Sequence, residues 1–130
     1  MNAMLFEVHS IKTLDDIEKG LHEAAAKQKF GVLTVHDLRA TLNKKGVELS
    51  REVRVYEVCN PQQAKKVLEA NPSISTALPC RIAVFATDSG NTLSMIRPTE
   101  MMRGFDTPGI ASVAQEVEQA MKTMMQDAAG

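Results

Sequence analysis

The tripeptide Cys59-Asn60-Pro61 is the first candidate for chemistry. Asparagine followed by proline is typical of the N-cap and first turn of a helix, so the thiol of Cys59 is expected where a strand ends and a helix begins. The amide groups and dipole of a helix start favour the thiolate, which is the nucleophilic and metal-binding form. The alternative is that Cys59 is a small buried side chain and Asn60 is a helix cap only.

The second candidate is Pro79-Cys80-Arg81, which places a thiol at the entrance to a strand beside a guanidinium group. This guanidinium could hold a carboxylate or phosphate, or could pair with an acidic side chain across the sheet. If the strands that carry the two cysteines are parallel, the thiols lie at opposite ends; if the second strand runs back, they lie together. The candidate ligand-binding residues are Cys59, Asn60, Cys80 and Arg81.

No other pattern in the sequence is typical of a catalytic or metal site. The histidines His9, His22 and His36 lack the spacing of metal ligands, and none neighbours a cysteine. Glycine-rich phosphate loops, nucleophile turns and paired carboxylates on one helix are also missing. We therefore expect neither a metal nor a cofactor, and the sequence identifies no catalytic residue. The methionines towards the C-terminus indicate core packing and a subunit contact.

The composition indicates a folded chain and excludes some classes of partner. With 130 residues, the chain has the usual length of one domain, residues 1–130. Apolar residues make up 44% and charged residues 24%, which separates it from disordered proteins. The formal net charge is -1 and no basic cluster occurs, so nucleic acid is not an expected partner. No apolar run is long enough for a membrane span, and two widely spaced cysteines favour a reducing compartment, so we expect a cytoplasmic protein.

Apolar periodicity and turn signals predict the elements that position these residues. The expected strands are residues 5–9, 30–35, 51–58, 80–86 and 92–97. The expected helices are residues 13–29 with Ile11 on its apolar stripe, residues 37–45, the segment from Asn60-Pro61 to Asn71-Pro72, and residues 108–126.

The resulting order is β-α-β-α-β-α-β-β-α, which predicts an α+β fold. Asp88-Ser89-Gly90-Asn91 has the composition of a tight turn and predicts an antiparallel hairpin between the last two strands. We expect a mostly antiparallel sheet with helices packed chiefly on one face. The run at residues 30–35 is apolar on both faces, which predicts a central strand with helices on one side and a second surface, such as a partner subunit, on the other.

Several of these motifs together resemble the domain-of-unknown-function 302 family. The resemblance rests on Cys59-Asn60-Pro61, Leu78-Pro79-Cys80 and the strand at residues 30–34, and it covers residues 4–98. It implies a compact α+β domain that forms a homodimer, and no established activity. The chain departs from the family pattern at Glu57-Val58, where small residues are common, and at Arg81, where asparagine is common, which fits a subgroup with a small anionic ligand.

The leading hypothesis is a dimeric binding or accessory module without catalysis of its own. The alternative is a thiol-dependent redox or sulfur-handling protein that uses Cys59 and Cys80, and a third hypothesis is a structural subunit of a larger complex. Exposure of the cysteines separates the first two, because a thiol enzyme needs an accessible sulfur of low pKa, whereas a packing cysteine is buried and inert.

Overall fold

The computed structural model describes residues 4–130 and contains a five-stranded sheet with the strand order β1-β5-β4-β3-β2. Every neighbouring pair of strands is antiparallel, which confirms the α+β class and the antiparallel sheet. The strands are β1 (Leu5–Ser10), β2 (Gly31–Asp37), β3 (Val53–Cys59), β4 (Cys80–Thr87) and β5 (Gly90–Ile96).

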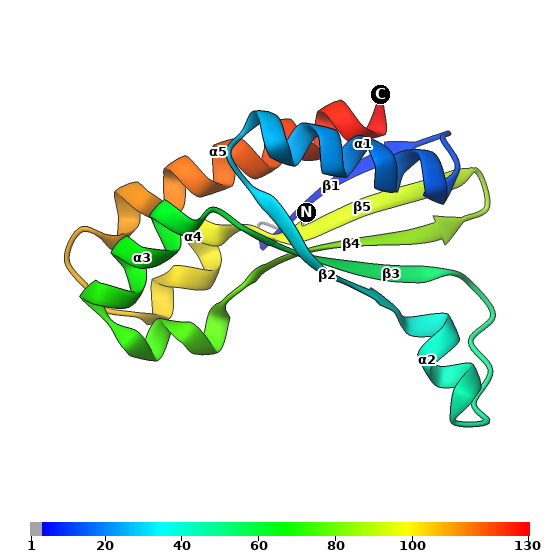
Figure 1. Cartoon of the computed structure of the whole chain (residues 1–130), viewed down its shortest axis with the longest axis horizontal. Coiled ribbons are helices and arrows are strands. Elements are labelled where there is room, and N and C mark those ends of the chain that lie inside the picture. Colours follow the sequence, from blue (N-terminus) through cyan, green and yellow to red (C-terminus); the bar gives the residue numbers. More distant parts are fainter. Residues whose placement is uncertain (1–3) are drawn as a thin grey trace.

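Helices connect these strands and cover one face of the sheet (Figure 1). They are α1 (Leu14–Lys27), α2 (Leu38–Lys44), α3 (Pro61–Ala70), α4 (Pro98–Met101) and α5 (Ile110–Ala129), with short 3-10 turns η1 (Pro72–Ala77) and η2 (Met102–Gly104). Figure 1 shows α1 and α5 side by side over the sheet, with α3 and α4 at one end of the molecule and α2 at the other. None of the helices in residues 4–130 is both long and apolar enough to cross a membrane.

The main core lies between the sheet and the pair formed by α1 and α5. Tyr56, Val58, Ile82, Val84, Leu93 and Met95 contribute from the strands, and Ile17, Leu21, Met121, Met124 and Met125 contribute from the helices. Full burial of such a side chain contributes roughly 1.5–3 kcal/mol to the hydrophobic free energy of folding. The methionines of α5 are therefore part of this core, as the sequence predicted.

Two expectations at the first helix and the following strand are wrong. Ile11 is 88% exposed and precedes α1, because the side chain of Thr13 accepts a hydrogen bond from the backbone N–H of Asp16 and begins the helix there. β2 is an edge strand rather than a central one. Its Leu33 is 60% exposed and its Val35 is 38% exposed, because only one neighbouring strand covers this edge.

The predicted hairpin is present, with a tighter turn than the four residues suggested. Thr87 pairs with Gly90, so only Asp88 and Ser89 lie between the paired positions. Gly90 has a positive φ of 145°, and a Cβ at this position would collide with the backbone carbonyl oxygen of Ser10. Glycine is therefore required where the hairpin meets the end of β1.

The C-terminal helix begins later than predicted and buries a charged residue. It starts at Ile110, after Gly109 with φ 81°, rather than at Pro108. Glu118 of this helix is only 7% exposed. Its carboxylate accepts hydrogen bonds from the backbone N–H and hydroxyl of Thr99, at 3.0 and 2.6 Å, and from Arg97 Nε at 3.2 Å. This carboxylate connects α5 to the start of α4.

The pairing of β3 with β4 decides where the cysteines lie. The strands are antiparallel, and Val58 pairs with Cys80. The end of β3 and the start of β4 therefore lie at the same end of the sheet, together with α3 and η1. Of the two arrangements that the sequence left open, the one that brings the thiols together is present.

Candidate functional site

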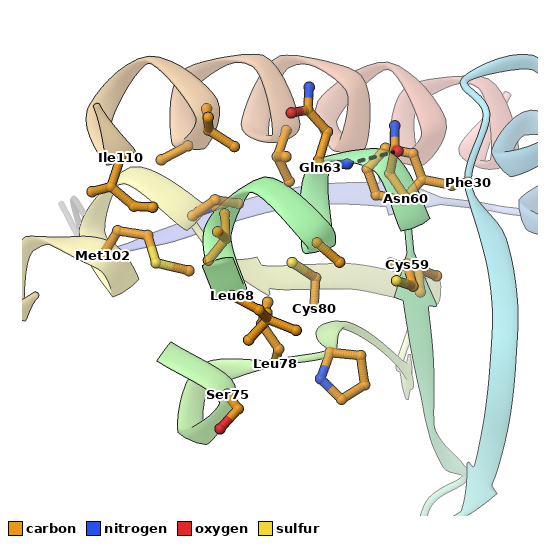
Figure 2. Close-up of a pocket in the computed structure, with 18 of the residues that line it drawn as sticks. Phe30, Cys59, Asn60, Gln63, Leu68, Ser75, Leu78, Cys80, Met102 and Ile110 are labelled. Atoms are coloured by element: carbon orange, nitrogen blue, oxygen red, sulfur yellow. Dashed lines mark hydrogen bonds between the residues drawn. The ribbon is translucent and has the colours of Figure 1, made fainter. Parts of the chain in front are cut away.

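A cavity of about 240 Å³ opens at the end of the sheet where β3 finishes and β4 begins (Figure 2). Helices α3 and α5 contribute two of its walls, and the segment leading into β4 contributes a third. The lining residues are Phe30, Leu33, Val58, Cys59, Asn60, Gln63, Ala64, Val67, Leu68, Ser75, Leu78, Pro79, Cys80, Pro98, Met102, Ile110, Val113, Ala114 and Val117. None of these side chains is charged, so the cavity is suited to an apolar occupant.

Local sequence signals shape one corner of this cavity. Asn60 is the N-cap of α3, and its Oδ1 accepts hydrogen bonds from the backbone N–H groups of Gln62 and Gln63, at 3.1 and 3.2 Å. Pro61 occupies the first turn, where its missing N–H costs nothing. On the other side, a cis peptide bond between Leu78 and Pro79 precedes Cys80. Asn60 thus lines the cavity while it also begins the helix.

Both thiols open onto the cavity and both are free. Cys80 is 7% exposed and Cys59 is half-buried. Burial raises the pKa of Cys59. Burial, followed by the proximity of Cys59, raises the pKa of Cys80 to about 11. Both groups are therefore neutral thiols near pH 7.

The expectation that the helix start favours a Cys59 thiolate is wrong, since the pKa moves in the opposite direction. The reason is local. Burial among the mostly apolar side chains of the cavity disfavours the charged thiolate.

The fourth candidate, Arg81, lies outside the cavity. Side chains alternate along a strand, so Arg81 points to the sheet face opposite to that of Cys80. Its guanidinium lies 3.5 Å from the carboxylate of Glu57, directly across the β3–β4 pairing, and His36 approaches the same carboxylate at 3.5 Å. Arg81 lines a separate hollow of about 220 Å³ with Thr76, Ala77, Leu78, Pro79, Ile96 and Met101. The structure therefore groups Cys59, Asn60 and Cys80, and separates Arg81 from them.

Gln63 and Ser75 are polar lining residues that the sequence analysis missed. Gln63 makes a contact between two helices. Its Nε2 donates a hydrogen bond to the carboxylate of Glu116 on α5 at 2.8 Å. Its Oε1 is buried and has no hydrogen-bond partner among residues 4–130. A signal was present in the sequence, because Gln63 lies one position before Ala64 and four before Val67, on the inward side of α3.

The lining offers neutral thiols, amides and a hydroxyl, but no charged acid or base. Within the described part of the chain, no group of three or more His, Cys, Asp or Glu side chains is placed to hold a metal ion.

Comparisons with known proteins agree with this fold. The family model described as "Domain of unknown function DUF302" matches residues 6–128. This match includes most of α5, which lies beyond the residues 4–98 that carried the resemblance in sequence. A similar solved structure is the crystal structure of an uncharacterized conserved protein DUF302 from Bacillus stearothermophilus, with a TM-score of 0.92 and 24% sequence identity. The superposition covers 98% of this chain and 99% of that chain. No curated protein matches the chain.

Proposed function

The chain belongs to the domain of unknown function DUF302 family, and we propose that it is a dimeric module that binds a small, mostly apolar ligand without catalysing its conversion. One observation carries this proposal: a cavity of about 240 Å³ whose lining contains no charged side chain and whose two thiols are neutral. Such a cavity favours an apolar molecule over water, because water there finds few hydrogen-bond partners.

The size of the cavity limits the ligand. An engineered apolar cavity of about 150 Å³ binds benzene, so a cavity of about 240 Å³ has room for a ligand of about ten non-hydrogen atoms. A ligand of this size that is held mainly by apolar contacts is expected to bind with a dissociation constant of roughly 0.1 mM. An aromatic ring with a short chain fits this description.

Propylbenzene is a suitable probe for this proposal. Met102 lines the cavity, so its methyl signal in a spectrum of ¹³C-methyl-methionine-labelled protein is expected to shift during a titration. Ala114→Leu fills the cavity and is expected to weaken binding at least tenfold, whereas Ala111→Leu, at an exposed position of the same helix, leaves it unchanged. If the Met102 signal stays constant up to the solubility limit of propylbenzene, the proposal is wrong.

The dimer in this proposal is expected to form through β2. An edge strand presents unpaired backbone N–H and C=O groups, and this one adds the exposed side chains of Leu33 and Val35. A second copy of the chain would cover both features. The α5 methionines do not support the interface, because they are buried within one chain. A cytoplasmic location remains part of the proposal, in keeping with two free thiols.

The second candidate function is thiol chemistry. It is favoured by the finding that Cys59 and Cys80 open onto one cavity, and it is opposed by their raised pKa values. A small anionic ligand also remains a prediction, and Arg81 would place it in the separate hollow rather than beside the thiols.

A further inference from the structure

We propose that helix α2 of the partner subunit covers the mouth of the cavity, so that two copies of the chain complete each binding site. This inference rests on the proposed binding function and on its dimer through β2. It adds the element of the partner subunit that closes the site. Two exposed apolar surfaces carry the inference: the rim of the cavity and one side of α2.

The rim of the cavity is apolar and is left uncovered by its own chain. Leu33 of β2 and Leu68 of α3 line the cavity, yet their side chains are 60% and 37% exposed. The pairing of β2 with β3 shifts between Val32 and Thr34, which makes Leu33 the extra residue of a β-bulge. A bulge re-aims side chains, so Val32 packs against the main core while the next residue also reaches the cavity. Figure 2 shows Leu68 on α3, at the same cavity as Leu78 and Cys80.

Helix α2 is the second uncovered surface. None of its seven residues is buried against the rest of residues 4–130. Leu38 is 36% exposed and Leu42 is half-buried, and residues four positions apart lie on the same side of a helix. Figure 1 shows α2 at the end of the molecule opposite to α3. Short helices are stabilised mainly by packing of their apolar side, so contact with a second chain would stabilise α2.

Antiparallel pairing of β2 with its copy brings these two surfaces together. β2 begins at the cavity, where Gly31 pairs with Cys59, and it ends at Asp37, the N-cap of α2. Its seven residues separate the two ends by roughly 20 Å, so α2 does not cover the cavity of its own chain. Identical strands that pair antiparallel are related by a twofold axis, which sets the end of one strand beside the start of the other. In this dimer, each α2 therefore lies at the cavity end of the partner subunit.

A single substitution on α2 tests the covering role. Leu38→Asp is expected to weaken propylbenzene binding about tenfold, because roughly 60 Å² of apolar ligand surface returns to water. The new carboxylate lies in the first turn, where a negative charge favours the helix itself. Ala40→Asp adds the same charge on the opposite side of α2, so this matched control keeps the wild-type affinity. The Met102 methyl signal reports the affinity in each case.

Mixed dimers show whether α2 acts on the cavity of the partner subunit. The Leu38→Asp chain carries the ¹³C-methyl-methionine label, and unlabelled Ala114→Leu chain is added in excess. The cavity of each labelled chain then faces an unaltered α2, while Ala114→Leu fills the other cavity. We expect the Met102 signal of the labelled chain to regain the wild-type affinity. An unlabelled chain that combines Ala114→Leu with Leu38→Asp supplies no unaltered α2 and should restore nothing.

The monomeric variant Val35→Lys provides an independent test, because Val35 does not line the cavity. It is expected to bind propylbenzene about tenfold more weakly than the wild-type chain.

The outcomes distinguish the two proposals. If Leu38→Asp or Val35→Lys binds propylbenzene as tightly as the wild-type chain, the covering role of α2 is overturned and the binding function stands. The same holds if excess Ala114→Leu chain restores nothing, or if the wild-type chain is a monomer that binds propylbenzene. If the wild-type chain does not bind propylbenzene, both proposals are overturned.

Discussion

Cys59, at the end of β3, and Cys80, at the start of β4, line one cavity because these strands are antiparallel neighbours. The arrangement brings the sulfurs together in apolar surroundings, where burial raises both pKa values. Proximity, which a thiol enzyme requires, is therefore combined with protonation, which suppresses nucleophilic attack.

Alkylation of the thiols is expected to be slow in the folded protein. A thiol with a pKa near 11 has roughly a hundredfold smaller thiolate fraction at pH 8 than a cysteine with the ordinary pKa of 9.0. Iodoacetamide labelling at pH 8, followed by mass spectrometry, should therefore be at least tenfold slower than in denaturant. Labelling of the Cys59→Ser and Cys80→Ser variants shows which thiol is responsible for each measured rate. A fast phase near pH 7 that disappears in Cys59→Ser would favour the thiol-dependent function instead.

The stability of the protein is expected to fall as the pH rises from about 9 to 11. The folded state holds the Cys80 proton up to a pKa of about 11, whereas the unfolded chain releases it from its ordinary value of 9.0, so alkaline pH favours the unfolded state. Two pKa units correspond to about 2–3 kcal/mol. Urea unfolding at several pH values measures this loss. Cys80→Ala should reduce the pH dependence without abolishing it, because the pKa values of Cys59 and Tyr56 are raised as well, and an equal slope in both proteins would contradict the assignment.

Replacing Glu118 is expected to destabilise the fold. Burial alone would raise the pKa of this carboxyl, but hydrogen bonds from Thr99 and Arg97 hold it below the ordinary value. Glu118→Ala removes the acceptor of these part-buried hydrogen bonds, so unfolding in urea should show a loss of about 2–4 kcal/mol. Gln119→Ala, on the exposed side of α5, is the control.

The stability of the protein is also expected to fall at acidic pH because of Glu118. Because its folded pKa is lowered from 4.5, its contribution is present above that pH and is lost as the pH falls through the folded value. Wild-type stability should therefore decline more steeply below pH 4.5 than that of Glu118→Ala. Parallel declines in the two proteins would show that Glu118 does not carry this dependence.

The chain is expected to have the mass of a dimer in light scattering at micromolar concentration. Val35→Lys places a charge on the exposed edge of β2 and should give a folded monomer, since Val35 belongs to neither core cluster of one chain. Glu7→Lys, on the opposite edge strand β1, should remain dimeric. A wild-type monomer would rule out the dimer, and a dimeric Val35→Lys would place the interface elsewhere.

Local sequence signals predicted most elements and the start of α3. Asn60-Pro61 indicated a cap and a first turn, and the capping hydrogen bonds are present. The turn at Asp88-Ser89 was likewise predicted, because such a signal acts between residues a few positions apart. The α+β class followed from the order of such elements.

The tertiary structure decided how the elements are arranged relative to one another, which local signals do not specify. The direction of β4 relative to β3, the edge position of β2 and the placement of α5 against α3 depend on contacts between distant residues. The sequence therefore determined that Cys59 precedes a helix start. Only the antiparallel pairing of β3 with β4 placed Cys80 at the same end of the sheet, and only burial in the cavity raised the pKa of Cys59. The hydrogen bond from Gln63 to Glu116 arises in the same way, since the two residues lie on different helices. Burial and electrostatic environment are properties of the packed molecule, because each depends on every group that surrounds a side chain.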